Sequence, residues 1–336
     1  MNKLKKMICY ILTLVCLLMT VATAEDALNE VIFSPEFCDS AEPGTGGVGY
    51  TACLNSAIYG LVGKNLYHWD PAASGDPQFF CTLPMNEYWD DSFRTLKKEE
   101  LAEDVLELLT SRVDGLAAGD GKLWGYNLTG GKIGEIDEAG IHWLPVTMDM
   151  SGLFRDGGLI RHFYECSSFV DHRYLYLFGE EGDSFSLVRF SLENGESERI
   201  DIRNAESCCP CGDQQALLVR REGRKALKLS VLDLNPGNIE DLPQKLPTPG
   251  KSGGEPDVAG GLAYDPDSSR ICFFLGETVW ASDAGSDFVS AGEFQPMSNG
   301  MPLTSDPCFP AWILPDSRYA ICMYCSLYVC RPETGR

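Results

Sequence analysis

Histidine and positive charge are scarce in this chain of 336 residues. It has four histidines, and its 27 lysines and arginines stand against 49 aspartates and glutamates, for a formal net charge of −22 at pH 7. A surface this negative repels the phosphates of nucleic acids and of anionic lipids. The composition therefore excludes nucleic acid as a partner. It leaves cations, basic peptides and neutral polymers as partners. Alternatively, the acidity only keeps the protein soluble.

Signatures of common enzymes are also missing. The sequence has no phosphate-binding loop, zinc-protease helix motif or dinucleotide fingerprint. Gly250–Gly254 matches Gly-x-Ser-x-Gly, but that motif needs a strand before the serine and a helix after it, and a Pro/Gly-rich segment surrounds it here. The four histidines fall in different units or linkers: His68, His142, His162 and His172. Enzymatic activity stays open, and these absences favour binding.

No later segment is apolar enough to cross a membrane, but the first 24 residues form a distinct leader. Lys3, Lys5 and Lys6 precede an uncharged apolar stretch, and Ala22–Ala24 supplies small residues for cleavage. We predict a signal peptide over residues 1–24, a single domain over residues 25–336, and a secreted, extracellular or cell-surface location. An uncleaved anchor is the alternative. Cleavage would remove three lysines and no acid, which takes the net charge to −25.

Twelve cysteines follow the leader, and export permits disulfides among them, although their pairing cannot be read from the sequence. They are Cys38, Cys53, Cys81, Cys166, Cys208, Cys209, Cys211, Cys272, Cys308, Cys322, Cys325 and Cys330. Cys208, Cys209 and Cys211 form the densest cluster and are the candidate metal ligands. A local disulfide and inert, reduced thiols are the alternatives for this cluster.

A strand–turn–strand pattern recurs along the chain. Its turns contain residues that tight reversals require, and its flanks are rich in aliphatic and aromatic residues that suit a pleated, half-buried sheet. The six instances are Ile58–Asp70, Leu116–Gly130, Tyr174–Gly195, Ala216–Gly237, Ile271–Gly285 and Tyr319–Gly335. Each of these segments is predicted to form a β-hairpin.

The spacing of the hairpins indicates a repeat architecture. The residues taken as equivalent are Leu66, Leu123, Leu187, Leu229, Val279 and Leu327, and the intervals between them are 57, 64, 42, 50 and 48 residues. Units of about 40–50 residues with several strands each predict a β-propeller. Ala263–Trp280 also aligns with Trp312–Tyr328, and each segment contains three consecutive strands.

Two segments carry a family resemblance. Trp124–Gly130 (WGYNLTG) and Phe190–Gly195 resemble the bacterial secreted β-propellers of the quinoprotein-like and low-density-lipoprotein-receptor-like kind. Blades of those proteins carry an aromatic strand followed by an Asp-Leu-x-Thr-Gly-like turn. The resemblance covers most of residues 50–336 and implies an all-β propeller of six four-stranded blades. Seven blades are the alternative, if Ile133–Cys166 forms one more.

Three segments depart from the repeat. Leu101, Val105 and Leu108 recur at helical spacing among charges, which predicts an inserted amphipathic helix near residues 95–112. The Pro/Gly-rich segment Pro243–Asp257 is predicted to be a loop. Glu30–Phe37 is predicted to supply the outer strand of the last blade and to close the ring, which would otherwise leave a sheet edge open. Alternatively, the sequence is part of a longer protein with a further domain.

Tryptophans provide the candidate binding residues. Trp69, Trp124 and Trp280 occupy comparable strand positions, so they are expected to pack between blades. Trp89 and Trp143 lie in connecting segments and are the candidates for an exposed contact with a ligand.

No cofactor is expected. Ca²⁺ is an alternative at Gly119–Gly121 and Asp265–Asp267, where turn formation alone also accounts for the aspartates.

The sequence thus predicts a secreted, non-enzymatic recognition propeller, expected to be a monomer. It would hold a peptide, a glycan or a partner protein on the face where loops from all blades converge. One alternative is a hydrolase or lyase that acts in the central channel. Another is a sensory or substrate-capture module of a larger surface or transport assembly. These functions rest on analogy at the level of the fold.

Overall fold

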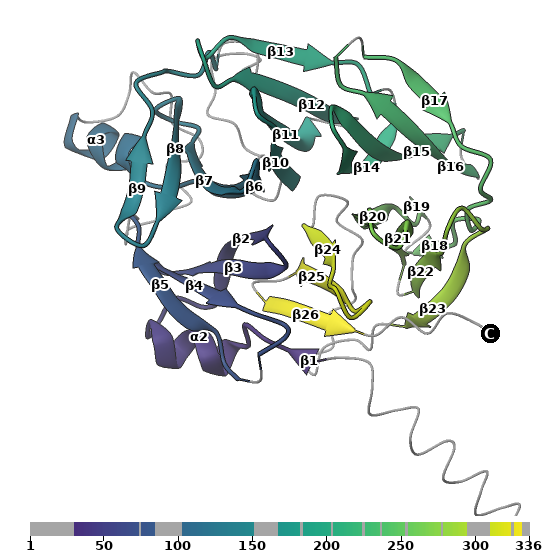
Figure 1. The fold of residues 1–336 in the computed structure, drawn as a ribbon, viewed down its shortest axis with the longest axis horizontal. Helices are drawn as coiled ribbons and strands as arrows, with labels where there is room; N and C mark the ends of the chain where they lie inside the picture. Colours follow the sequence, from purple (N-terminus) through teal and green to yellow (C-terminus); the bar gives the residue numbers. More distant parts are fainter. Residues whose placement is uncertain are drawn as a thin grey trace, which may run out of the picture.

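A computed structural model describes residues 30–73, 75–84, 103–150, 167–181, 184–202, 204–223, 226–235, 237–252, 255–276, 278–293, 310–323 and 326–330. Six four-stranded antiparallel sheets are arranged as blades around a common axis (Figure 1). The chain is therefore a six-bladed β-propeller, as the repeat predicts. Ile133 and the residues that follow it complete the second blade rather than starting a seventh.

In each of the first five blades, four consecutive strands run from the axis to the rim. Blade 1 contains β2 (Val48–Leu54), β3 (Ala57–Val62), β4 (Asn65–Trp69) and β5 (Gln78–Thr82). Blade 2 contains β6 (Gly115–Gly119), β7 (Lys122–Asn127), β8 (Lys132–Asp137) and β9 (Gly140–Trp143). Blade 3 contains β10 (Ser167–Val170), β11 (Tyr174–Glu181), β12 (Ser184–Ser191) and β13 (Ser197–Ile200).

Blade 4 contains β14 (Ala205–Gly212), β15 (Gln215–Glu222), β16 (Ala226–Asp233) and β17 (Ile239–Asp241). Blade 5 contains β20 (Ala259–Asp265), β21 (Arg270–Leu275), β22 (Thr278–Ser282) and β23 (Val289–Glu293). The three consecutive strands predicted in Ala263–Trp280 are β20, β21 and β22. Between blades 4 and 5, the segment predicted as a loop contains a small extra pair, β18 (Lys251–Ser252) and β19 (Glu255–Pro256).

Blade 6 is built from both ends of the described chain. It contains β24 (Ala311–Ile313), β25 (Tyr319–Met323), β26 (Ser326–Cys330) and, at the rim, β1 (Glu30–Val31). Glu30 pairs with Val329 and Val31 with Tyr328, so the N-terminal segment closes the ring as predicted. The closing strand is shorter than expected, because Ser34 caps helix α2 (Pro35–Ala41) and Pro35 lies in its first turn.

The second helix lies where the periodicity placed it. Helix α3 (Glu103–Ser111) falls inside the predicted range, and residues 85–102 lie outside the described part of the chain. Asn127 of β7 donates from Nδ2 to the carbonyl oxygens of Leu109, at 2.8 Å, and Arg112, at 2.9 Å, and so ties the end of this helix to blade 2. No helix of the described residues is long and apolar enough to span a membrane.

The equivalence predicted for Leu123 in blade 2 is wrong by one strand. Leu66, Leu187 and Leu229 lie on the third strand of their blades, but Leu123 lies on β7, the second strand of blade 2. The reason is the chemistry of the Asp120-Gly121 turn, which joins the first and second strands of blade 2. Turns of this composition join the second and third strands in other blades. Ile133 of β8 is the residue that corresponds to Leu66.

The hydrophobic core is divided into six clusters, each of which fills the space between two neighbouring blades. Successive residues of a strand point to opposite faces of the blade. Leu217 and Val219 therefore pack toward blade 5, whereas Leu218 packs toward blade 3. Trp69 and Trp124 are buried in two of these clusters, and Trp280 packs against a third, as expected for tryptophans between blades.

Arginines join four of the blade junctions by donating to a backbone carbonyl of the next blade in the ring or of the segment that leads into it. Arg189 donates to Leu234 at 2.7 Å, Arg221 to Asp257 at 2.5 Å, Arg270 to Ser317 at 3.2 Å and Arg318 to Pro71 at 3.0 Å. Each guanidinium also pairs with a carboxylate, on Glu198, Glu206, Asp283 and Asp316 respectively. The planar fork of an arginine can satisfy both partners at once.

Candidate functional site

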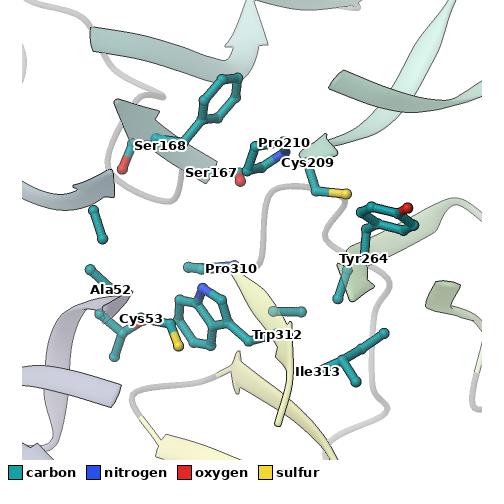
Figure 2. A pocket seen from close by; sticks show the side chains of 15 residues that line it. Ala52, Cys53, Ser167, Ser168, Cys209, Pro210, Tyr264, Pro310, Trp312 and Ile313 are labelled. Atoms are coloured by element: carbon teal, nitrogen blue, oxygen red, sulfur yellow. The ribbon is translucent and has the colours of Figure 1, made fainter. Parts of the chain in front are cut away.

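The inner strands of all six blades surround a cavity of about 210 Å³ on the propeller axis (Figure 2). The lining residues are Thr51, Ala52 and Cys53 of β2; Ala118 of β6; Ser167, Ser168 and Phe169 of β10; Cys209 and Pro210 of β14; Ala263 and Tyr264 of β20; and Pro310, Ala311, Trp312 and Ile313 at β24.

Many of these residues lie close to the last residue of their inner strand, for example Cys53 in a strand that ends at Leu54, whereas Ser167 begins the short strand β10 and Pro310 precedes β24. The inner strands therefore bring the cavity close to the turns that join first and second strands. We call the face of the propeller that carries these six turns the turn face.

The inner strands can present unusual residues to the axis because each of them is the edge of its sheet. An edge strand leaves some backbone groups without a ladder partner, so it tolerates proline and bulges. Pro210 and Pro310 both line the cavity. The pairing of β14 with β15 shifts register beside Pro210, and the pairing of β20 with β21 shifts just before Ala263.

The polar groups of the lining are uncharged, and several have no protein partner. Thr51 is 6% exposed, and its buried hydroxyl makes no hydrogen bond. The Ser168 hydroxyl donates to the carbonyl of Leu116 at 2.6 Å. The hydroxyls of Ser167 and Tyr264 and the indole N–H of Trp312 have no hydrogen bond within the described structure. The cavity thus offers three uncommitted hydrogen-bonding groups, on Ser167, Tyr264 and Trp312, whereas the Thr51 oxygen is itself buried.

Aromatic surface accompanies these polar groups. Trp312 projects from β24 into the space between Pro310 and Cys53, and Tyr264 lies on the opposite side of Pro310 in this view (Figure 2). Trp312 and Cys53 both pack against the cluster between blades 6 and 1. Trp312 therefore contacts the core and also borders the cavity.

The two thiols of the lining remain neutral at physiological pH. Burial raises the pKa of the Cys53 thiol to about 12, although the backbone N–H of Ser56 partly offsets the effect. Burial, with the neighbouring Cys208 and Cys211, raises the pKa of Cys209 well above its usual value. The fifteen lining side chains include no carboxylate, imidazole, ammonium or guanidinium group. This donor set suits an uncharged ligand.

Charge appears instead in the six turns that follow the inner strands. Five of these turns contain an aspartate: Asp120, Asp171, Asp213, Asp267 and Asp316. The same turns contain two arginines, Arg173 and Arg318, and Arg318 is already paired with Glu30 and Asp316. The turn face around the axis is therefore net negative, and it repels anions.

Of the two tryptophans predicted to contact a ligand, Trp143 does not line this cavity. Trp143 is the last residue of β9, at the rim of blade 2, where it packs against the cluster between blades 1 and 2. The ammonium of Lys132 lies 5.9 Å from its ring centroid. Trp89 lies outside the described residues.

The cysteine cluster is split between two faces of blade 4. Cys208 packs in the cluster between blades 3 and 4, whereas Cys209 and Cys211 pack toward blade 5. All three are free thiols. Within the described ranges, no three metal-ligating side chains gather at one point. The cluster therefore contributes Cys209 to the cavity wall rather than forming a centre of its own.

The aspartates considered for Ca²⁺ lie in turns of the turn face. Asp265 accepts a hydrogen bond from the backbone N–H of Asp267 at 3.2 Å and another from the hydroxyl of Ser268. Asp120 adopts a positive φ of 53° at the reversal between β6 and β7. Both sites show the turn geometry that the sequence interpretation allowed.

Sequence reasoning missed Thr51, Ser167, Tyr264 and Trp312. Each looks like an ordinary strand residue when read alone. A structural signal connects them, since each lies on the first strand of its blade. That position is recognised only when the blades are aligned strand by strand.

Comparisons with known proteins add neighbours at the level of shape. No family model matches the chain, and no curated protein matches it. A streptogramin B lyase structure is 13% identical, with 91% of this chain and 97% of that one covered and a TM-score of 0.45. PorZ, a surface component of the type-IX secretion system of Porphyromonas gingivalis, is 13% identical, with coverages of 88% and 32% and a TM-score of 0.41. A chain of the nidogen–laminin complex is 12% identical, with coverages of 76% and 81% and a TM-score of 0.41.

Proposed function

We propose that the protein is a recognition propeller that holds a ligand in the axial cavity without converting it. The observation that carries this proposal is the partly buried indole of Trp312, which borders the axial cavity and whose N–H has no hydrogen bond within the described structure. A buried indole N–H usually finds a hydrogen-bond partner, and a ligand in the cavity would supply one.

Convergence of the blades supports the same conclusion. Each inner strand contributes at least one residue to the cavity, so no single blade could form it. Pockets that bind small molecules are typically concave and largely apolar, with a few polar groups that fix orientation. The axial cavity, with aromatic and apolar side chains and a few polar groups in its lining, fits that description.

Binding is favoured over catalysis by the chemistry of the lining. General acid–base catalysis works best with a group whose pKa lies near the working pH. The thiols of Cys53 and Cys209 are instead shifted far into their protonated form. These groups suit a wall that recognises a ligand by shape and hydrogen bonds.

Ligand screening with paired readouts tests the proposal. The purified protein would be screened by thermal shift and calorimetry against libraries of peptides, glycans and small metabolites, and each hit would be incubated and recovered. We expect saturable binding that Trp312→Ala abolishes, with the ligand recovered chemically unchanged. Conversion of a hit by the protein, lost in the same variant, would reject the proposal in favour of a channel enzyme.

We further propose that the protein acts outside the cell, on the basis of the predicted leader. The exported protein is then expected to begin at Glu25. N-terminal sequencing of the protein from the culture medium or cell surface checks this. A chain that remains in the cytoplasm with Met1 in place would contradict it.

A further inference from the structure

The three uncommitted groups of the cavity differ in their hydrogen-bonding roles. The hydroxyls of Ser167 and Tyr264 can each donate and accept, whereas the Trp312 indole donates. A ligand that satisfies them needs donors and acceptors distributed around a compact body. Hydroxyl groups on a ring provide this arrangement, because every hydroxyl can act in either role.

The indole of Trp312 adds a flat apolar surface to the same cavity. It has no stacked aromatic or cationic partner among the described residues, in contrast to Trp69, over which Arg318 lies. Apolar C–H groups of a ring can pack on such a surface while hydroxyls at the ring edge reach polar groups around it.

Charge narrows the ligand class further. The lining contains no cation that could pair with a carboxylate, sulfate or phosphate. Five turn aspartates against two arginines also surround the axis on the turn face. Uronic acids, sulfated sugars and sugar phosphates would lose hydration on entry without a compensating ion pair.

From these observations we infer that the axial cavity binds a neutral sugar ring, such as the terminal residue of an uncharged oligosaccharide. The ring packs on Trp312, and its hydroxyls contact Ser167 and Tyr264. This inference rests on the proposed binding function and specifies its ligand class.

A matched pair of serine variants tests the inference. Ser167 begins β10 and lines the cavity, whereas Ser197 begins β13 at the rim of the same blade and does not line it. Ser167→Ala and Ser197→Ala therefore remove the same group from two places in one blade. Both residues are partly exposed, so both variants are expected to fold.

The purified protein and both variants would be applied to an array of neutral, acidic and sulfated glycans, and the best hit would be measured by calorimetry. We expect neutral glycans to bind. Ser167→Ala should weaken that binding about fivefold to tenfold, the usual range for one lost hydrogen bond, while Ser197→Ala leaves it unchanged. Trp312→Phe, which keeps a ring and loses the N–H, should give an intermediate loss.

The outcomes separate this inference from the broader function. Binding of a peptide or an acidic glycan that depends on Trp312 and Ser167 would overturn the sugar assignment and keep the recognition function. Binding of a neutral glycan that both serine variants retain equally would place the sugar elsewhere and overturn the inference. Conversion of the bound glycan would reject the binding function itself.

Discussion

Arg318 and Glu30 are 288 positions apart in the sequence, yet Nη1 of the arginine lies 3.1 Å from Oε2 of the glutamate. The same guanidinium donates to the carbonyl of Pro71 at 3.0 Å and lies 5.5 Å from the ring centroid of Trp69. One side chain of blade 6 thus contacts the closing strand and the first blade. It holds the ring together at the place where the two ends of the chain meet.

Arg318→Ala should lower the free energy of unfolding by about 2 kcal/mol, because it removes a charge-assisted hydrogen bond and a cation–π contact at a half-buried site. Glu30→Gln should cost less than about 0.5 kcal/mol, since Glu30 is exposed and its ion pair is screened by water. Urea unfolding of the two variants checks this order. Lys122→Ala, which breaks an exposed ion pair with Glu135, is the control. An equal loss of stability in all three variants would contradict the role of Arg318 in joining blade 6 to the closing strand and to blade 1.

Gly119→Ala should destabilise the propeller by about 1–3 kcal/mol, because a Cβ at this position would overlap the backbone carbonyl of Val170 in the next blade. Gly212→Ala is the matched control. Gly212 also ends an inner strand, and the nearest atom to its Cβ would be Oε1 of Gln215 at 3.8 Å. Thermal unfolding of the two variants gives the comparison, and similar midpoints would show that β6 and β10 can separate without cost.

Native Cys53 should react slowly with iodoacetamide at pH 8. With a pKa of about 12, roughly one thiol in ten thousand is ionised at that pH, and the thiolate is the reactive form. Unfolding in guanidinium chloride should restore ordinary reactivity. Peptide mapping by mass spectrometry measures both rates, and Cys211, whose pKa burial raises to about 11, should react faster in the native protein. Equal labelling of Cys53 in the native and unfolded chain would contradict its burial at the cavity wall.

Asp241 should make the stability of blade 4 depend on pH in the acid range. A hydrogen bond from the Ser230 hydroxyl, followed by one from Lys228, lowers the pKa of Asp241. A carboxylate with a lowered pKa in the folded state stabilises the protein above its unfolded pKa of about 3.9, and that stabilisation is lost as the pH falls through the folded value.

Comparison of the protein with Asp241→Asn isolates this effect. The unfolding midpoint of the original protein should be slightly higher at pH 7, and the difference should narrow below about pH 4. High salt should also reduce it, since the group is largely exposed. A difference that stays constant from pH 7 to pH 3 would show that Asp241 acts through packing rather than charge.

The sequence predicted the fold better than the site, for a physical reason. Blade hairpins depend on local turn chemistry and alternation, which a single segment displays. The same logic failed in blade 2, where the turn at Asp120 belongs to a different pair of strands. It also missed helix α2, although Ser34 and Pro35 are the residues that typically begin a helix.

The cavity depends instead on residues that meet only when the ring closes. Thr51 and Trp312 are separated by nearly the whole chain and belong to strands with no local mark of function. The search for exposed tryptophans led to Trp143 because it looks for aromatics in connections. The structure places the uncommitted groups on the inner strands, which are the edges of their sheets. The periodicity of a single strand does not show which residues of the other blades lie near these groups.

Because β1 closes the ring, blade 6 can be completed only after its C-terminal strands have been synthesised. Blade 6 needs residues 30–31 and residues 311–330 in the same sheet, so its rim waits for the final strands to emerge from the ribosome. The axial cavity needs β24 and is completed at the same moment. A nascent chain that lacks its last few dozen residues therefore has five blades' worth of sequence and no axial cavity.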